Sequence, residues 1–275
     1  MDALTRAFDP ARPAHGPLIP FPLPVLVPFA AVGLGGLALG RLGWTSAEAV
    51  RILGVVGFHG GLLAAALAAA WEGTGGWRPH ATLGALWFLI AAAACSAVPW
   101  GCLAYLLPPI GVALVALRYP ECRRMGLAPP ADWRALGLGA AAGCFLGAHL
   151  LVSASRTWWY PVRLNPSVPY LTDVLYDVGA NVLSAECFFR GTLFNRWQRR
   201  WGFWAGVLAA TGLSVLRYLV DPALPRTVEM IAGAIFYLTL LSLSGCALLW
   251  YSGSLWPSLA ASLLFFGAYR MLQVW

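Results

Sequence analysis

The sequence predicts an all-α fold, namely a polytopic transmembrane helix bundle with about eight spans. Of its 275 residues, 60% are apolar and only 11% are charged, whereas a soluble domain carries about a quarter charged residues. The mean hydropathy is +0.71. This composition excludes a cytosolic enzyme, a disordered chain and a nucleic-acid binder. The six cysteines are scattered without metal-ligand spacing, so we expect no metal and no cofactor.

Apolar runs of about 20 residues, the length that crosses a bilayer, mark the expected spans. The uncharged stretch 81–117 is too long for one span, so we divide it at 96–101, where Pro99 and Gly101 are tolerated among neighbouring helices. Residues 1–20 precede the first span and lack the features of a cleavable signal peptide. In chain order, the spans are expected near 21–40, 52–71, 81–117 (two spans), 135–155, 170–189, 204–220, 229–251 and 255–273.

The segment 170–189 differs from the other spans because it carries Asp173, Asp177, Asn181 and Glu186. Ionisable groups are costly in lipid, so this segment should face the protein interior or a water-filled cavity. The total is eight spans, or nine if this polar segment crosses completely. The expected organisation is a cytoplasmic N-terminal segment, an N-terminal group of spans and a motif-bearing core, at 1–20, 21–117 and 118–275.

Arginine-rich loops set the expected orientation. Residues 118–134 and 190–200 each hold four arginines, and such loops are cytoplasmic by the positive-inside rule. An even number of spans before Arg118 then places the N-terminus in the cytoplasm as well. All 18 basic residues are arginine, which is typical of a GC-rich bacterial genome. We therefore expect a multi-pass protein of the bacterial inner membrane.

The segment 184–194 is the densest cluster of polar groups within the spans. Glu186 and Arg190 are four residues apart, so they share a helix face and can pair, which also suits a purely structural ion pair. The letters A-E-C-F-F-R-G-T-L-F resemble the E-E-x-x-F-R-G-x-L-F signature of the CPBP family of intramembrane proteases, which includes type II CAAX prenyl endopeptidases. Y-S-G-S-L-W-P at 251–257 resembles the family's T-G-S-L-W-x-P segment, and M-G-L at 125–127 resembles its L-G-L lead-in.

The resemblance implies a catalytic centre in which the first Glu is a general base, while two histidines and an asparagine bind water or a metal. Here the first Glu is Ala185, and only Glu186 and Arg190 match. The second motif offers Arg217, or Tyr218 if the register slips by one residue. Ser262 and Phe266 stand where the third motif has its His and Asn. No histidine follows His149, so these positions lack the required base and ligands.

Two hypotheses follow. The first is a catalytically degenerate member, a pseudoenzyme that serves as a binding scaffold or accessory subunit of a membrane complex, with the lipid bilayer and another membrane protein as partners. The second is an active CAAX-type endopeptidase with a rearranged site, in which Glu186 is the base and Asp177 or His149 assists. A lone intramembrane histidine such as His59 or His149 is more often hydrogen-bonded to a carbonyl than a ligand.

Overall fold

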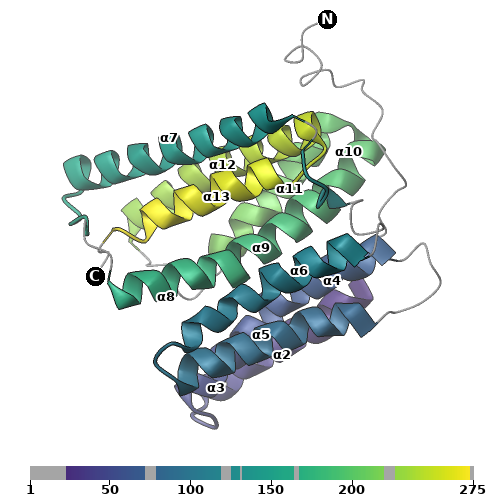
Figure 1. The fold of residues 1–275 in the computed structure, drawn as a ribbon. Coiled ribbons are helices and arrows are strands. Elements are labelled where there is room, and N and C mark those ends of the chain that lie inside the picture. Colours follow the sequence, from purple (N-terminus) through teal and green to yellow (C-terminus); the bar gives the residue numbers. More distant parts are fainter. Residues whose placement is uncertain are drawn as a thin grey trace, which may run out of the picture. The chain divides into compact units, whose positions relative to one another are not determined.

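The computed structural model describes residues 23–71, 79–118, 125–130, 132–163, 167–219 and 227–272, and these form helices joined by short connections (Figure 1). Within the described residues, Val162 and Leu272 also form an isolated antiparallel β-bridge. The predicted all-α class is therefore confirmed. The expected N-terminal segment 1–20 and two loop arginines, Arg123 and Arg124, lie outside the described residues.

Most of the predicted spans coincide with helices, although three boundaries were wrong. The second helical stretch begins at Ala47, the polar segment stays helical to Trp201 instead of ending in a loop at 190, and the last helix ends at Tyr269. The predicted break at 96–101 is confirmed. In chain order, the elements are α2 (Leu23–Arg41), α3 (Ala47–Gly54), η1 (Val55–Gly60), α4 (Gly61–Trp71), α5 (Pro79–Ala97), η3 (Gly101–Leu106), α6 (Leu107–Arg118), α7 (Trp133–Thr157), α8 (Val168–Tyr176), η5 (Asp177–Val182), α9 (Leu183–Ala185), η6 (Glu186–Phe194), α10 (Asn195–Trp201), α11 (Phe203–Leu219), α12 (Val228–Ser252) and α13 (Trp256–Tyr269).

Local capping explains several helix ends. The Ser46 hydroxyl accepts from the backbone N–H of Ala49, so helix α3 starts earlier than hydropathy alone predicts. Asp132 and Thr227 cap α7 and α12 in the same way. Gly253 closes α12 at φ +67°, a left-handed conformation that glycine adopts without strain.

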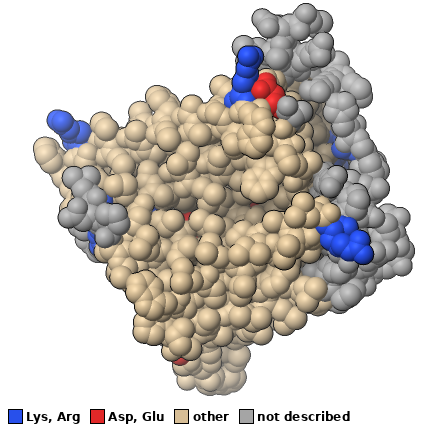
Figure 2. Space-filling model, in the orientation of Figure 1, with Lys and Arg blue, Asp and Glu red and all other residues tan. Residues whose placement is uncertain are grey.

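The helices suit a bilayer. Five stretches are long and apolar enough to cross a membrane, and two shorter apolar helices cover residues 82–97 and 203–219. Large apolar side chains point outward along them, among them Phe145 at 68% exposure. On the face shown in Figure 2, charged side chains are few, and the rest of the described surface is uncharged. Exposed apolar surface of this extent indicates contact with lipid.

The chain divides into two compact units. One comprises Ala128–Val174 and Phe189–Trp275, and the other comprises Ile19–Leu127 and Leu175–Phe188. We call them the C-terminal unit and the N-terminal unit. The continuous helical run from α8 to α10 contributes residues to both.

Glycines bring the helices of the N-terminal unit close together. A Cβ added at Gly57 in η1 would collide with the backbone of Gly33 in α2, and one at Gly61 would lie 2.6 Å from the Phe29 Cβ. A Cβ at Gly179 in η5 would likewise collide with the Tyr105 carbonyl in η3. Such small-residue contacts let helix backbones approach in lipid.

Helices α7 and α13 form the closest helix pair of the C-terminal unit. Gly139, Gly143 and Gly147 recur at four-residue intervals on α7, and they face Pro257, Ala261 and Ala268 on α13. The residue numbers of the contacting pairs increase in the same direction along both helices. The two helices therefore run parallel, side by side (Figure 1). Helix α12 packs against both.

Candidate functional site

The polar helical run carries two π-helical segments, and most of its polar side chains are buried. Asp177 and Asn181 lie in η5, whereas Glu186 and Arg190 lie in η6; their exposed fractions are 2%, 5%, 1% and 3%. π-Helical turns are rare and occur frequently at functional sites. The prediction that segment 170–189 faces the interior is confirmed for Asp177, Asn181 and Glu186.

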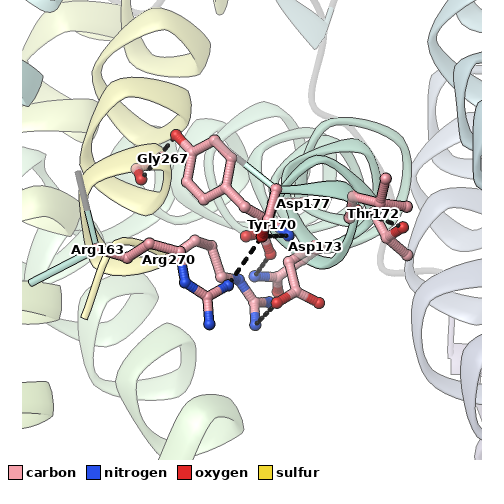
Figure 3. Close-up of polar contacts among 10 residues, drawn as sticks. Arg163, Tyr170, Thr172, Asp173, Asp177, Gly267 and Arg270 are labelled. Atoms are coloured by element: carbon pink, nitrogen blue, oxygen red, sulfur yellow. Dashed lines mark hydrogen bonds and ion pairs between the residues drawn. The ribbon is translucent and has the colours of Figure 1, made fainter. Parts of the chain in front are cut away.

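Asp173 is the exception within this run. Its side chain is 50% exposed, and its carboxylate lies 3.9 Å from the guanidinium of Arg270 at the end of α13 (Figure 3). Asp177, one turn further along, instead accepts a 3.0 Å hydrogen bond from the Asn181 amide. The two carboxylates therefore have different environments, with Asp177 buried and Asp173 half exposed beside a guanidinium.

In the N-terminal unit, a histidine from outside the motif segment reaches the polar run. The Nδ1 atom of buried His59 lies 3.2 Å from the Ser184 hydroxyl, and its Nε2 atom lies 2.6 Å from the Tyr176 hydroxyl. The Tyr176 ring also meets the rings of His59 and Tyr105 edge to face, at 5.4 Å in both cases. Sequence reasoning treated His59 as an isolated histidine and missed this cluster.

These contacts define what the His59 imidazole can do. A neutral imidazole has one donor and one acceptor nitrogen, and hydroxyls can serve either role, so both tautomers are satisfied. The Ser184 hydroxyl can also donate to the Asn181 carbonyl at 3.4 Å. The ring can therefore adopt either tautomer, with the Tyr176 and Ser184 hydroxyls exchanging donor and acceptor roles.

We expect Tyr176→Phe to lower the free energy of unfolding by about 0.5–1.5 kcal/mol, the usual net value of one hydrogen bond. The ring contacts with His59 and Tyr105 would remain, so the loss reports the interactions of the hydroxyl, including the 2.6 Å contact with His59. Thermal unfolding in detergent measures it. Tyr160→Phe, on a half-buried tyrosine after α7, is the matched control and should leave stability unchanged.

In the C-terminal unit, Arg190 lies at the meeting point of three helices. Its Nη1 atom donates to the Ser214 hydroxyl of α11 at 3.3 Å. A Cβ added at Gly245 of α12 would lie 3.3 Å from its Nε atom and would collide with Ser258 of α13. The buried guanidinium is therefore a polar centre around which α11, α12 and α13 pack.

The positions that match the family's later motifs form an aromatic and cationic stack. The Arg217 guanidinium lies 4.3 Å above the Tyr218 ring, and that ring stacks on Phe266 at 5.6 Å. Ser262 is buried one turn before Phe266, at 3% exposure. Both register alternatives of the second motif, Arg217 and Tyr218, thus contribute to the same stack. Ala185, which replaces the family's first Glu, is 2% exposed and belongs to the N-terminal unit.

His149, the remaining polar candidate, has a local partner in the C-terminal unit. Its Nδ1 atom lies 2.7 Å from the Tyr237 hydroxyl of α12. Phe145 lies one turn before it at a ring distance of 6.2 Å, and His149 itself is exposed on α7. We expected a backbone carbonyl as the hydrogen-bond partner of His149, whereas the observed partner is a hydroxyl.

The donors present do not fit the metal or water site that the resemblance implies. Arg217, Tyr218, Ser262 and Phe266 offer no imidazole and no carboxamide. Across the described ranges there is also no group of three or more His, Cys, Asp and Glu side chains that could hold a metal ion. A metal held in the family's manner would need ligands that these side chains do not supply.

Comparison with known proteins agrees with the motif resemblance. The family model described as type II CAAX prenyl endopeptidase Rce1-like matches residues 167–266. No curated protein and no solved structure matches the chain. The matched segment contains Ala185, Glu186, Arg190, the Arg217–Tyr218–Phe266 stack and Ser262, whereas His59 and His149 lie outside it. Residues 167–266 therefore carry the Rce1-like signature of the CPBP family, in a multi-pass helical membrane protein.

Proposed function

We propose that this chain is a catalytically degenerate CPBP-type protein that binds a partner within the bilayer instead of cleaving it. It would serve as a scaffold or accessory subunit of a membrane complex. The Arg217–Tyr218–Phe266 stack carries the proposal, because it stands where the family has the side chains that bind its water or metal.

The chemistry of the stack supports binding over hydrolysis. A guanidinium does not deprotonate in proteins, so Arg217 offers no general base. Phe266 is buried, so Arg217 and Tyr218 are the members of the stack that can contact aromatic or apolar groups of a partner. Tyr218 is half buried, so part of the stack is accessible.

An active endopeptidase with a rearranged site is the second candidate, and one observation favours it. The His59 imidazole reaches Ser184, two residues before Glu186, and so brings an imidazole to the motif helix, whose own sequence has none. In this alternative, Glu186 would be the catalytic base, and His59 would hold the helix or relay the proton.

The two candidates differ in their response to Glu186→Ala. For the scaffold, we expect partner proteins to be recovered in unchanged stoichiometry after purification from native membranes, as measured by native mass spectrometry. Glu229→Ala, in the first turn of α12, is the matched control for loss of a carboxylate. Accumulation of an uncleaved membrane substrate in the Glu186→Ala strain, reproduced by His59→Gln but not by Glu229→Ala, would establish the endopeptidase instead.

We also propose that the protein lies in a bacterial inner membrane with a cytoplasmic N-terminus. Arginines near 118–134 and 190–200 support this orientation. Reporter fusions after residues 126 and 165 test it, because only the first should report a cytoplasmic location.

A further inference from the structure

We propose that one end of the C-terminal unit binds the phosphate group of a phospholipid between Arg163 and Arg270, beside the exposed indole of Trp159. The site is separate from the motif residues. It does not depend on whether the chain cleaves a substrate or only binds a partner.

Backbone contacts hold the two arginines at the same place. After α7, the chain reverses and pairs with the C-terminal segment through the bridge between Val162 and Leu272, and the Arg163 N–H donates to the Met271 carbonyl at 2.7 Å. The Tyr170 hydroxyl donates to the Gly267 carbonyl at 3.3 Å and ties α8 to the end of α13. Figure 3 shows both guanidinium groups close together near Asp173. The positions of the arginines are thus built into the fold.

Among the residues described at this place, positive charges outnumber negative charges. Asp173 lies 3.9 Å from Arg270, and its side chain is half exposed. Arg163 donates to a neutral group, the Ser167 hydroxyl, at 3.0 Å. Arg156, exposed in the last turn of α7, adds a further positive charge on the chain leading into the reversal. Guanidinium forks match the geometry of phosphate oxygens, so an anion of this type neutralises the excess charge.

Trp159, four residues before Arg163, is held in a strained and exposed conformation. In the described part of the chain, Trp159 is the one non-glycine residue with a positive φ, at +58°. Its side chain is 82% exposed. The N–H groups of Trp158 and Tyr160, on either side, both lie 3.2 Å from the Ala154 carbonyl. Left-handed backbone is unfavourable for a bulky side chain, and such strain points to a function. Tryptophan favours the level of the lipid headgroups, where this indole would lie.

The neighbouring surface favours a lipid over a free anion. Phe145 and Val152 are seven residues apart on α7, so they share one face, and they are 68% and 62% exposed. An apolar face that leads to a cationic end provides a path for acyl chains below a bound phosphate. Inorganic phosphate would contact the arginines but would gain nothing from this face.

Lipid binding to the full chain in a neutral detergent tests the proposal. Native mass spectrometry would follow titrations with phosphatidylglycerol, with a diacylglycerol of the same acyl chains and with inorganic phosphate. We expect phosphatidylglycerol to bind, diacylglycerol to bind far more weakly, and inorganic phosphate at equal concentration not to displace the lipid. The Arg163→Gln/Arg270→Gln variant should bind phosphatidylglycerol about tenfold more weakly, or worse, because charge-assisted bonds are lost.

Two further variants separate binding from folding. Trp159→Gly accepts the positive φ, so it should keep or raise thermal stability while it weakens lipid binding severalfold. Arg134→Gln, exposed at the opposite end of α7, is the charge-matched control and should bind as the parent does. Equal lipid binding by the double arginine variant and the parent would overturn the proposal. Displacement by inorganic phosphate would also overturn it, in favour of a free-anion site.

Discussion

Gly143→Ala is expected to destabilise the protein by roughly 1–3 kcal/mol, the cost of overpacking a tight contact. A Cβ at this position would collide with the carbonyl oxygen of Ala261 on the parallel helix α13. A flexible side chain could move aside, but a backbone carbonyl within a helix cannot. The two helices must therefore separate, and the loss would appear as a lower midpoint of thermal unfolding in detergent.

The same substitution six residues earlier, Gly137→Ala, is expected to have the opposite effect on stability. Gly137 lies on α7 with no atom within 4 Å of an added Cβ, so Gly137→Ala changes the helix propensity alone. That change should stabilise the protein by about 0.5–1 kcal/mol. Destabilisation of similar size at both positions would show that α7 and α13 do not pack through the glycine face.

Arg190→Ala is expected to lower the free energy of unfolding by roughly 3–5 kcal/mol, because the sequence predicts a buried charged pair that would lose one partner. Arg190 is 3% exposed, and its loss would also leave the Ser214 hydroxyl without its donor. Glu186, four residues earlier, is the partner that the sequence predicts. Chemical or thermal unfolding measures the loss, and reduced expression should accompany it.

A double-mutant cycle tests that pairing directly. We expect Glu186→Gln/Arg190→Gln to be more stable than the sum of the two single changes predicts, with a coupling above about 0.5 kcal/mol. Arg190→Lys keeps the charge but not the planar fork, so it should lose less than Arg190→Ala. Additive single effects would show that the two residues are not partners, even though both are buried.

The spans were predictable because hydropathy and helix-breaking residues such as proline and glycine act locally. The break within 81–117 followed from Pro99 and Gly101, and α7, α11 and α12 begin and end within a few residues of the predicted limits. The extension of the polar run to Trp201 was missed because arginines were taken to mark a loop. Residues 195–201 instead form the amphiphilic end of a helix, which hydropathy alone does not reveal.

The candidate site was less predictable because its contacts cross long distances in the sequence. The motif letters around Glu186 identified the right helix, and the family match agrees with them. The contact between His59 and Ser184 joins residues 125 positions apart, and no local pattern encodes it. The stack of Tyr218 on Phe266 likewise depends on how α11 and α13 are placed by the whole fold.

The route of the polar helical run has a consequence for the order of assembly. The N-terminal unit contains Leu175–Phe188 in addition to its first 109 residues, Ile19–Leu127. This short segment supplies Tyr176 and Ser184, the partners of buried His59. During synthesis, the N-terminal unit therefore cannot be completed until Leu175–Phe188 is made, after about two thirds of the chain. Until then, the His59 imidazole lacks the Tyr176 and Ser184 hydroxyls, so the nascent N-terminal unit is an incomplete intermediate.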